Sequence, residues 1–176
     1  GSPMPETVDS INELNKSLFK SEEVDFFCEP IEARKKAMNY LARREYGHLE
    51  LQGKLENVGF DAETARITVD NLADEGLQCD RRFIESFIQS RINQGKGPVR
   101  IRLDLDERKL ESSLIDELLS ECSEDWIAMA QQIRNKKFGP KLPVEFKEKA
   151  RQMSFLQYRG FESNQIQAAI MSHGQE

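Results

Sequence analysis

The stretch that decides the fold is "GKGPVRIRLDLDERKL", residues 95–110. Apolar and charged residues alternate along it from Val99 to Asp106, and a period of two is typical of a half-buried β-strand. Pro98 follows a glycine, however, and proline is favoured at the first position of an α-helix. The stretch therefore fits two structures: an amphipathic strand, or a helix with two arginines on its surface.

An internal repeat decides between them. Three segments have matching ends: "LQGKLENVGF" (51–60), "IRLDLDERKL" (101–110) and "QMSFLQYRGF" (152–161) each have a leucine five positions before a final apolar residue. A glycine precedes that final residue in two of the copies, as it commonly does at the C-terminal end of a helix. The third copy shows no alternation, so a fold shared by all three copies makes 101–110 helical.

The flanks of the three segments repeat as well. Each segment is preceded by an amphipathic pattern that ends in a turn, and is followed by another pattern with apolar residues at helical spacing. Asp61 is a suitable N-cap for the first of these following helices. Each unit therefore reads as helix, turn, helix, tight turn, helix. We predict an all-α fold of three tandem three-helix repeats of about 50 residues each, with the boundaries 31–79, 80–125 and 126–176.

Residues 1–30 do not fit the repeat. Gly1–Pro3 resemble the remnant of an expression vector ahead of Met4, and part of the following stretch is amphipathic. We expect an N-terminal arm here, either helical or flexible, that Pro30 closes.

Composition points to an intracellular protein. The chain has 176 residues, of which 38% are hydrophobic, enough for one sizeable core or a few small ones. No apolar run approaches the roughly 20 residues of a membrane-spanning helix, and the start does not resemble a signal peptide. The three cysteines lack CxxC spacing, which indicates free thiols in a reducing compartment. We therefore expect a cytoplasmic location and no membrane partner.

The net charge of −6 is divided into blocks along the chain. Residues 80–109 carry 8 Lys/Arg against 5 Asp/Glu, 126–159 carry 8 against 2, and 110–125 carry 6 acidic residues and no basic one. Such blocks predict localised basic faces for a partner of mixed charge, because a protein that coats DNA is usually basic throughout. The candidate contacts to carboxylates or phosphates are Arg81, Arg82, Arg91, Lys96, Arg100, Arg102, Arg134, Lys136, Lys137, Lys141, Lys149 and Arg159.

The second repeat also carries a family resemblance. "DRRFIESFIQSRINQGKGPVRIRLDLDERKL" (80–110) resembles the RecX family of bacterial recombination regulators. "LQYRGFESNQI" (156–166) is similar to the matching C-terminal stretch of the family, and the resemblance covers about 31–172. The shared pattern of the first stretch comprises Phe83-Ile84, Arg91, Gly95-x-Gly97-Pro98, Arg100-Ile101 and Asp104-Leu105.

Three positions depart from the family pattern. Asp104 stands where the pattern usually has glutamate, and Lys109 stands where it usually has glycine. Cys79 interrupts the acidic and aliphatic residues that often precede the first helix of the repeat. None of these changes removes a candidate contact residue, although Lys109 bears on how its turn closes.

The resemblance implies a regulator that binds the RecA recombinase and RecA–single-stranded DNA filaments. It implies suppression of their ATP hydrolysis, strand exchange and co-protease activity, and thereby modulation of recombination and SOS-type repair. It also implies an elongated, curved arrangement of the three repeats in the helical groove of the filament. We expect a monomer that has weak affinity for DNA.

Two other functions are compatible with these features. A stand-alone binder of single-stranded nucleic acid would use the basic faces of repeats 2 and 3, and a helical adaptor would serve a different partner. Duplex reading by a helix-turn-helix is disfavoured because the third helices of the first two repeats are acidic or neutral. The histidines, His48 and His173, lie far apart, and no phosphate-loop motif is present. We therefore expect no enzymatic activity, no cofactor and no metal.

Overall fold

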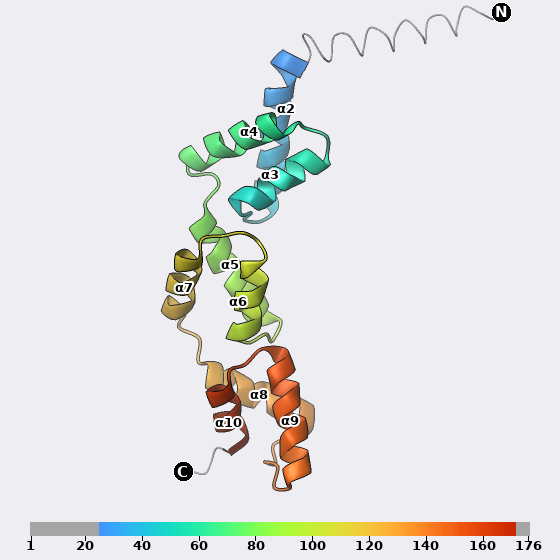
Figure 1. Ribbon diagram of the computed structural model, residues 1–176, viewed down its shortest axis with the longest axis vertical. Helices are drawn as coiled ribbons and strands as arrows, with labels where there is room; N and C mark the ends of the chain where they lie inside the picture. The colour runs from blue at the N-terminus through green and yellow to red at the C-terminus, as the bar shows by residue number, and fades with distance from the viewer. Residues whose placement is uncertain (1–24, 172–176) are drawn as a thin grey trace, which may run out of the picture. The chain divides into compact units, whose positions relative to one another are not determined.

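The computed structural model describes residues 25–171, with only the backbone given for 25–28. All regular elements in this range are α-helices, so the predicted all-α fold is confirmed (Figure 1). The helices form three consecutive three-helix bundles, and the chain divides into two compact units between Cys79 and Asp80. The first unit holds the first bundle, and the second unit holds the second and third bundles.

The first bundle consists of α2 (Asp25–Arg43), α3 (His48–Asn57) and α4 (Ala62–Asp74). Asp61 caps α4 as predicted, because its carboxylate accepts a hydrogen bond of 2.8 Å from the backbone N–H of Thr64. A bidentate ion pair between Arg34 and Glu75 joins α2 to the end of α4. The core of this bundle is formed by Ala37, Tyr46, Leu51, Leu55, Ala65, Val69 and Leu72.

The expectation that Pro30 closes an N-terminal arm is wrong, because Pro30 lies inside α2. A proline removes only its own N–H from the helical hydrogen-bond ladder. The fully buried Ala33 and Ala37 follow it, and α2 packs against α4. Tertiary packing thus maintains the helix through the proline, while residues 1–24 of the expected arm lie outside the described range.

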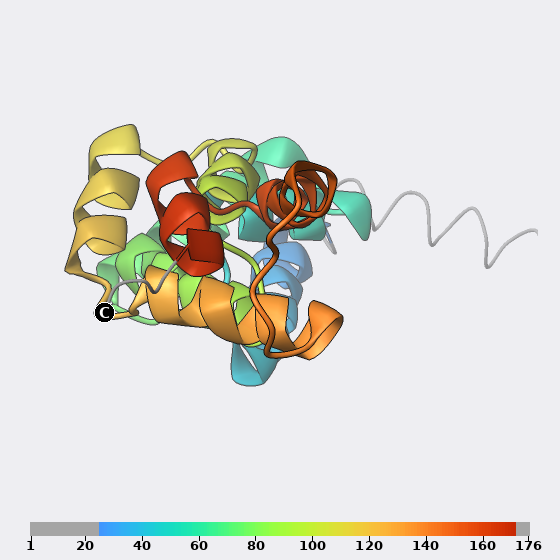
Figure 2. The same ribbon diagram turned by 90° about the horizontal axis from the view of Figure 1, so that it is seen from below.

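The second bundle consists of α5 (Asp80–Asn93), α6 (Pro98–Asp106) and α7 (Ser112–Glu121). The third consists of α8 (Trp126–Phe138), α9 (Phe146–Arg159) and α10 (Ser163–Met171). In Figure 2, α10 lies across α8 and beside α9, and both pairs are in contact. Each bundle has a core of its own, while Ile92 and Trp126 pack against both cores.

The deciding stretch is a helix, α6, with Pro98 in its first turn. Ile101 and Leu105 are fully buried in the core of the second bundle, as i, i+4 neighbours on one helix face should be. Val99 and Leu103 are 41% and 54% exposed. Only alternate members of the apolar series therefore reach the core, and the period of two along this stretch is accidental.

The tight turn after the middle helix has the same handedness in all three bundles. Gly59, Lys109 and Gly160 have φ angles of 117°, 57° and 98°. Lys109 is the one described residue other than glycine with a positive φ. Its Cβ makes this backbone conformation less favourable than it is for glycine. Lys109 therefore forms the same turn as the two glycines, but with conformational strain in its backbone.

We expect Leu105→Ala to lower the free energy of unfolding by about 2–5 kcal/mol, because it leaves a cavity in the core. Leu103→Ala, on the exposed face of the same helix, should change it by about 0.5 kcal/mol or less. Denaturant unfolding followed by circular dichroism compares the two variants. Equal losses would contradict the helix and favour a strand with both leucines on one face.

We expect Lys109→Gly to raise the free energy of unfolding by about 1 kcal/mol, because glycine adopts a positive φ without strain. Lys109→Ala is the control, since it removes the charge and keeps the Cβ. Thermal unfolding of both variants measures the effect. A gain from the alanine variant as large as that from glycine would assign the effect to charge.

Candidate functional site

The second and third bundles are joined by backbone hydrogen bonds between two turns. The N–H of Gly97 donates to the carbonyl of Arg159 over 2.8 Å, and the N–H of Val99 donates to the carbonyl of Gly160, also over 2.8 Å. These donors belong to the start of α6, and the acceptors belong to the end of α9. The first N–H groups and the last carbonyls of a helix lack partners within the helix. The free N–H groups at the start of α6 and the free carbonyls at the end of α9 therefore satisfy one another.

This joint requires glycine on both sides. A Cβ on Gly97 would lie 2.5 Å from the carbonyl oxygen of Gly160, and a Cβ on Gly160 would lie 2.7 Å from the backbone nitrogen of Arg100. The guanidinium of Arg159 donates to the carbonyl of Gly95 over 3.2 Å. The Gly95-x-Gly97-Pro98 pattern thus has a structural role: it lets two helix ends meet backbone to backbone.

Some predicted contact residues are engaged inside the second bundle. Arg81 on α5 pairs with Glu117 on α7 at 2.7 Å, and this hydrogen bond holds the pKa of the Glu117 carboxyl below its ordinary value. Arg102 on α6 pairs with Asp106 at 3.0 Å and with Asp116 on α7. The acidic block 110–125 therefore neutralises basic residues of its own bundle.

Arg91 and Arg82 also make contacts within the protein. Arg91 at the end of α5 pairs with Asp104 of α6 at 3.4 Å, and its guanidinium lies 4.0 Å from the centre of the Phe87 ring. Arg82 is exposed on α5, but it also interacts with other groups of the protein and is therefore not a free cation. Arg91 is therefore better explained as a brace between α5 and α6 than as an open contact.

Arg134 does not lie on the expected basic surface. It is only 2% exposed, and its guanidinium donates to the carbonyls of Pro140 and Lys141 at 3.4 and 3.2 Å and to Gln152 at 3.3 Å. Burial lowers the pKa of this guanidinium. Arg134 holds the loop between α8 and α9, and the pattern of basic residues alone did not distinguish it from its exposed neighbours.

The remaining candidates form no ion pair among the described residues. Lys136, Lys137 and Arg159 line a groove of about 490 Å³ between the end of α5 and helices α8 and α9. Phe155 lines the same groove, with Lys137 and Arg159 at 5.7 and 5.2 Å from its ring centre. We call these four residues and their surroundings the basic groove.

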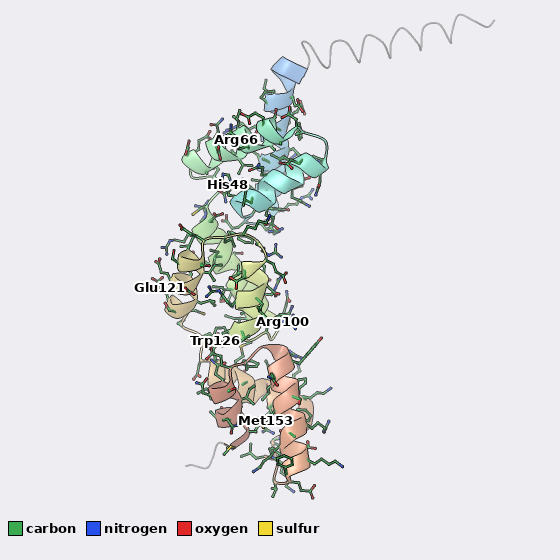
Figure 3. All side chains as sticks on the ribbon, viewed as in Figure 1. His48, Arg66, Arg100, Glu121, Trp126 and Met153 are labelled. Atoms are coloured by element: carbon green, nitrogen blue, oxygen red, sulfur yellow. The ribbon has the colours of Figure 1, made fainter. Side chains whose placement is uncertain are left out.

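The other unpaired cations lie near the joint or on the third bundle. Arg100 is half-buried beside the joint, 5.8 Å from the ring centre of Tyr158, and Lys96 is half-buried in the α5–α6 turn. Figure 3 shows Arg100 and Trp126 where the second and third bundles meet. Lys141 is exposed in the α8–α9 loop, and Lys149 is half-buried on α9.

The basic groove is suited to binding anionic groups. Arginine and lysine beside an aromatic ring can hold carboxylates or phosphates next to a flat apolar surface. No cluster of three His, Cys, Asp or Glu residues suited to a metal ion occurs in the described part of the chain. Sequence reasoning overlooked Phe155 and Tyr158, although the i, i+4 spacing of Phe155 and Arg159 on a predicted helix was a usable signal.

Comparisons with known proteins agree with the repeat structure. The model of the second three-helix domain of RecX matches residues 80–119, and the model of its third three-helix domain matches 123–170. "Regulatory protein RecX" of Pseudomonas savastanoi pv. phaseolicola is 40% identical over 145 residues, which are 82% of this chain and 94% of that protein. This chain belongs to the RecX family.

Other RecX proteins give the same result. The regulatory protein RecX of Halorhodospira halophila is 41% identical over 136 residues, 77% of this chain and 84% of that protein. The crystal structure of RecX from Lactobacillus salivarius matches with a TM-score of 0.67 at 18% identity, over 80% of this chain and 94% of that one. A regulatory role follows from membership. Within the described range, no helix is long and apolar enough to cross a membrane.

We expect Gly97→Ala to lower the free energy of unfolding of the second unit by about 1–3 kcal/mol, because its Cβ meets backbone that cannot move aside. Gly97 has a φ of −84°, so the backbone conformation itself permits alanine. The control is Gly53→Ala within α3, where a Cβ meets nothing within 4 Å and helix propensity should give a gain of about 0.5–1 kcal/mol. Hydrogen exchange at the backbone amides of Val99 and of the α9–α10 turn shows where Gly97→Ala destabilises the protein. Unchanged protection of these amides in the variant would contradict the joint.

Proposed function

We propose that this RecX-family protein binds RecA and the RecA–single-stranded DNA filament and lowers their ATP hydrolysis, strand exchange and co-protease activity. Family membership supports a regulatory role, and the family resemblance of the sequence points to RecA as the partner. The structural observation that supports such a partner best is the basic groove, whose cations have no carboxylate partner within the described residues. The protein acts in the cytoplasm and by binding alone.

The proposed mechanism rests on cations that are distributed over the second and third bundles, which the joint connects. A nucleoprotein filament offers carboxylates on its protein and phosphates on its DNA, and arginine and lysine bind either group. Lys136 and Lys137 on α8, Arg159 on α9 and Arg100 on α6 lie on two bundles held together by the joint. Several weak contacts on one body add up to useful affinity without a deep pocket. Contacts to neighbouring RecA subunits would hold them in an arrangement unsuited to hydrolysis or growth.

A second candidate is stand-alone binding of single-stranded nucleic acid. Phe155 and Tyr158 lie beside unpaired cations, and base stacking on aromatic rings next to basic residues is typical of such binders. The net charge of −6 and the internal neutralisation of Arg81 and Arg102 weigh against it, since affinity for bare nucleic acid comes mainly from phosphate neutralisation.

Charge reversal in the basic groove tests the proposal. Lys136→Glu with Lys137→Glu should raise the concentration that half-inhibits the RecA ATPase on single-stranded DNA about tenfold, because like charges then face the partner. The matched control is Lys35→Glu with Lys36→Glu, an adjacent exposed pair on α2 in which Lys36 likewise lies near an aromatic ring. Equal inhibition by the two double variants would remove the basic groove from the interface.

DNA binding by the protein alone, measured beside the ATPase titration, separates the two functions. Inhibition well below one regulator per RecA, where the protein by itself binds DNA weakly, supports filament-directed regulation. Inhibition that appears only once enough protein is present to coat the DNA, with affinity that falls steeply as salt rises, supports the stand-alone binder.

A further inference from the structure

A second groove lies on the second unit, apart from the residues of the basic groove. It has a volume of about 640 Å³ and is bounded by α6, α7, the α7–α8 connection and the start of α10. Val99, Leu103, Leu119 and Trp126 supply apolar lining, and Val99 and Leu103 are 41% and 54% exposed. We call it the α6–α7–α10 groove.

The rim of this groove is acidic. Glu124 and Glu162 line it and form no ion pair among the described residues. The charge of Asp116, also in the lining, is matched by Arg102. The groove therefore combines accessible apolar surface with two uncompensated carboxylates, which suits an apolar segment with basic flanks.

The same chain displays a segment of that kind. Val144 and Phe146 are 81% and 86% exposed, the highest exposures among the large apolar side chains described. They follow Lys141 and precede Lys147, both exposed, and the exposed Glu145 lies between them, so residues 139–147 carry two lysines against one glutamate. We call residues 139–147, which connect α8 to α9 and open α9, the protrusion.

Hydrogen bonds from a buried arginine order the backbone of the protrusion. The buried guanidinium of Arg134 donates to the carbonyls of Pro140 and Lys141, and Pro140 and Pro143 restrict the backbone between the helices. The role of the buried Arg134 is therefore to order this segment and not to contribute to the basic groove. A segment already ordered loses less conformational entropy on binding than a flexible one.

We propose that the protrusion of one copy of this protein occupies the α6–α7–α10 groove of a second copy. Val144 and Phe146 would cover the exposed apolar lining around Val99 and Leu103, and the flanking lysines would meet Glu124 and Glu162. The complementarity of both apolar surface and charge within one chain favours a second copy as the occupant over an unrelated protein.

The contact forms between copies and not within one. The groove adjoins the joint at Val99, and the protrusion lies at the opposite end of α9, which has 14 residues and therefore a length of about 21 Å. Two different surfaces pair, so each added copy presents a further free protrusion or groove. The protrusion offers two exposed apolar side chains to this contact. Dilute protein therefore stays monomeric, and copies aligned along an extended partner pair through high local concentration.

Disulfide trapping at about 1 mM protein, the order of effective concentration that tethering gives, tests this proposal without RecA. Cys122 lines the groove and has a free thiol. One protein carries Cys28→Ser and Cys79→Ser and keeps Cys122. The other carries all three Cys→Ser changes and Val144→Cys, and the two differ in mass through a tag. After mild oxidation, the yield of mixed dimers should exceed by about tenfold the yield obtained when Tyr158→Cys replaces Val144→Cys.

Tyr158 is a matched control site because it is 75% exposed on α9 and lies outside the protrusion. Equal mixed-dimer yields from the two sites, or a predominance of dimers between identical proteins, would overturn the proposal. Circular dichroism of each variant verifies that the helices are retained.

Charge exchange supplies a second readout. Lys141→Glu with Lys147→Glu in the Val144→Cys protein should lower the mixed-dimer yield about tenfold, because carboxylates then face carboxylates. Glu124→Lys with Glu162→Lys in the Cys122 protein should lower it similarly when introduced alone. Combining the two reversed proteins should restore the yield, and a lack of recovery would overturn the proposed pairing.

Discussion

The backbone joint between the α5–α6 turn and the α9–α10 turn is the interaction on which the rest of the second unit depends. Two N–H groups at the start of α6 and two carbonyls at the end of α9 have no partners within their own helices, and they satisfy one another. The arrangement also brings the positive end of one helix dipole to the negative end of another. Gly97 and Gly160 allow this approach because any Cβ would overlap backbone of the facing turn.

The two bundles of the second unit differ in how their charges are paired. In the second bundle, Arg81, Arg91 and Arg102 are paired with acidic side chains of the same bundle. Lys136, Lys137 and Arg159, on the other side of the joint, keep their charges open in a groove that reaches back to the end of α5. Three arginines of the second bundle are therefore neutralised internally, and most of the cations available to a partner lie on the third bundle, with Arg100 beside the joint.

The basic pattern does not distinguish exposed cations from those engaged inside the protein. Arg134 and Lys136 are two positions apart in one basic run, yet Arg134 is buried beneath a loop and Lys136 is exposed. Arg100 and Arg102 are two positions apart in the same basic run, but the Asp116 carboxylate on α7 pairs with Arg102. Such differences arise from helix orientation and from partners distant in sequence, which a count of charges along the chain does not contain.

Sequence by itself determined the helical repeat, the position of each tight turn and the family, because helical periodicity, glycine placement and motif spacing are local properties of the chain. The repeat was sufficient to assign α6 as a helix against its misleading alternation. Tertiary structure decided which cations remain open, why Gly97 and Gly160 are glycines, and where Val144 and Phe146 protrude. Several of these outcomes depend on contacts between different helices and turns, from 14 residues apart for Arg102–Asp116 to 64 residues apart for Arg159–Gly95. Such contacts form only after the helices have packed.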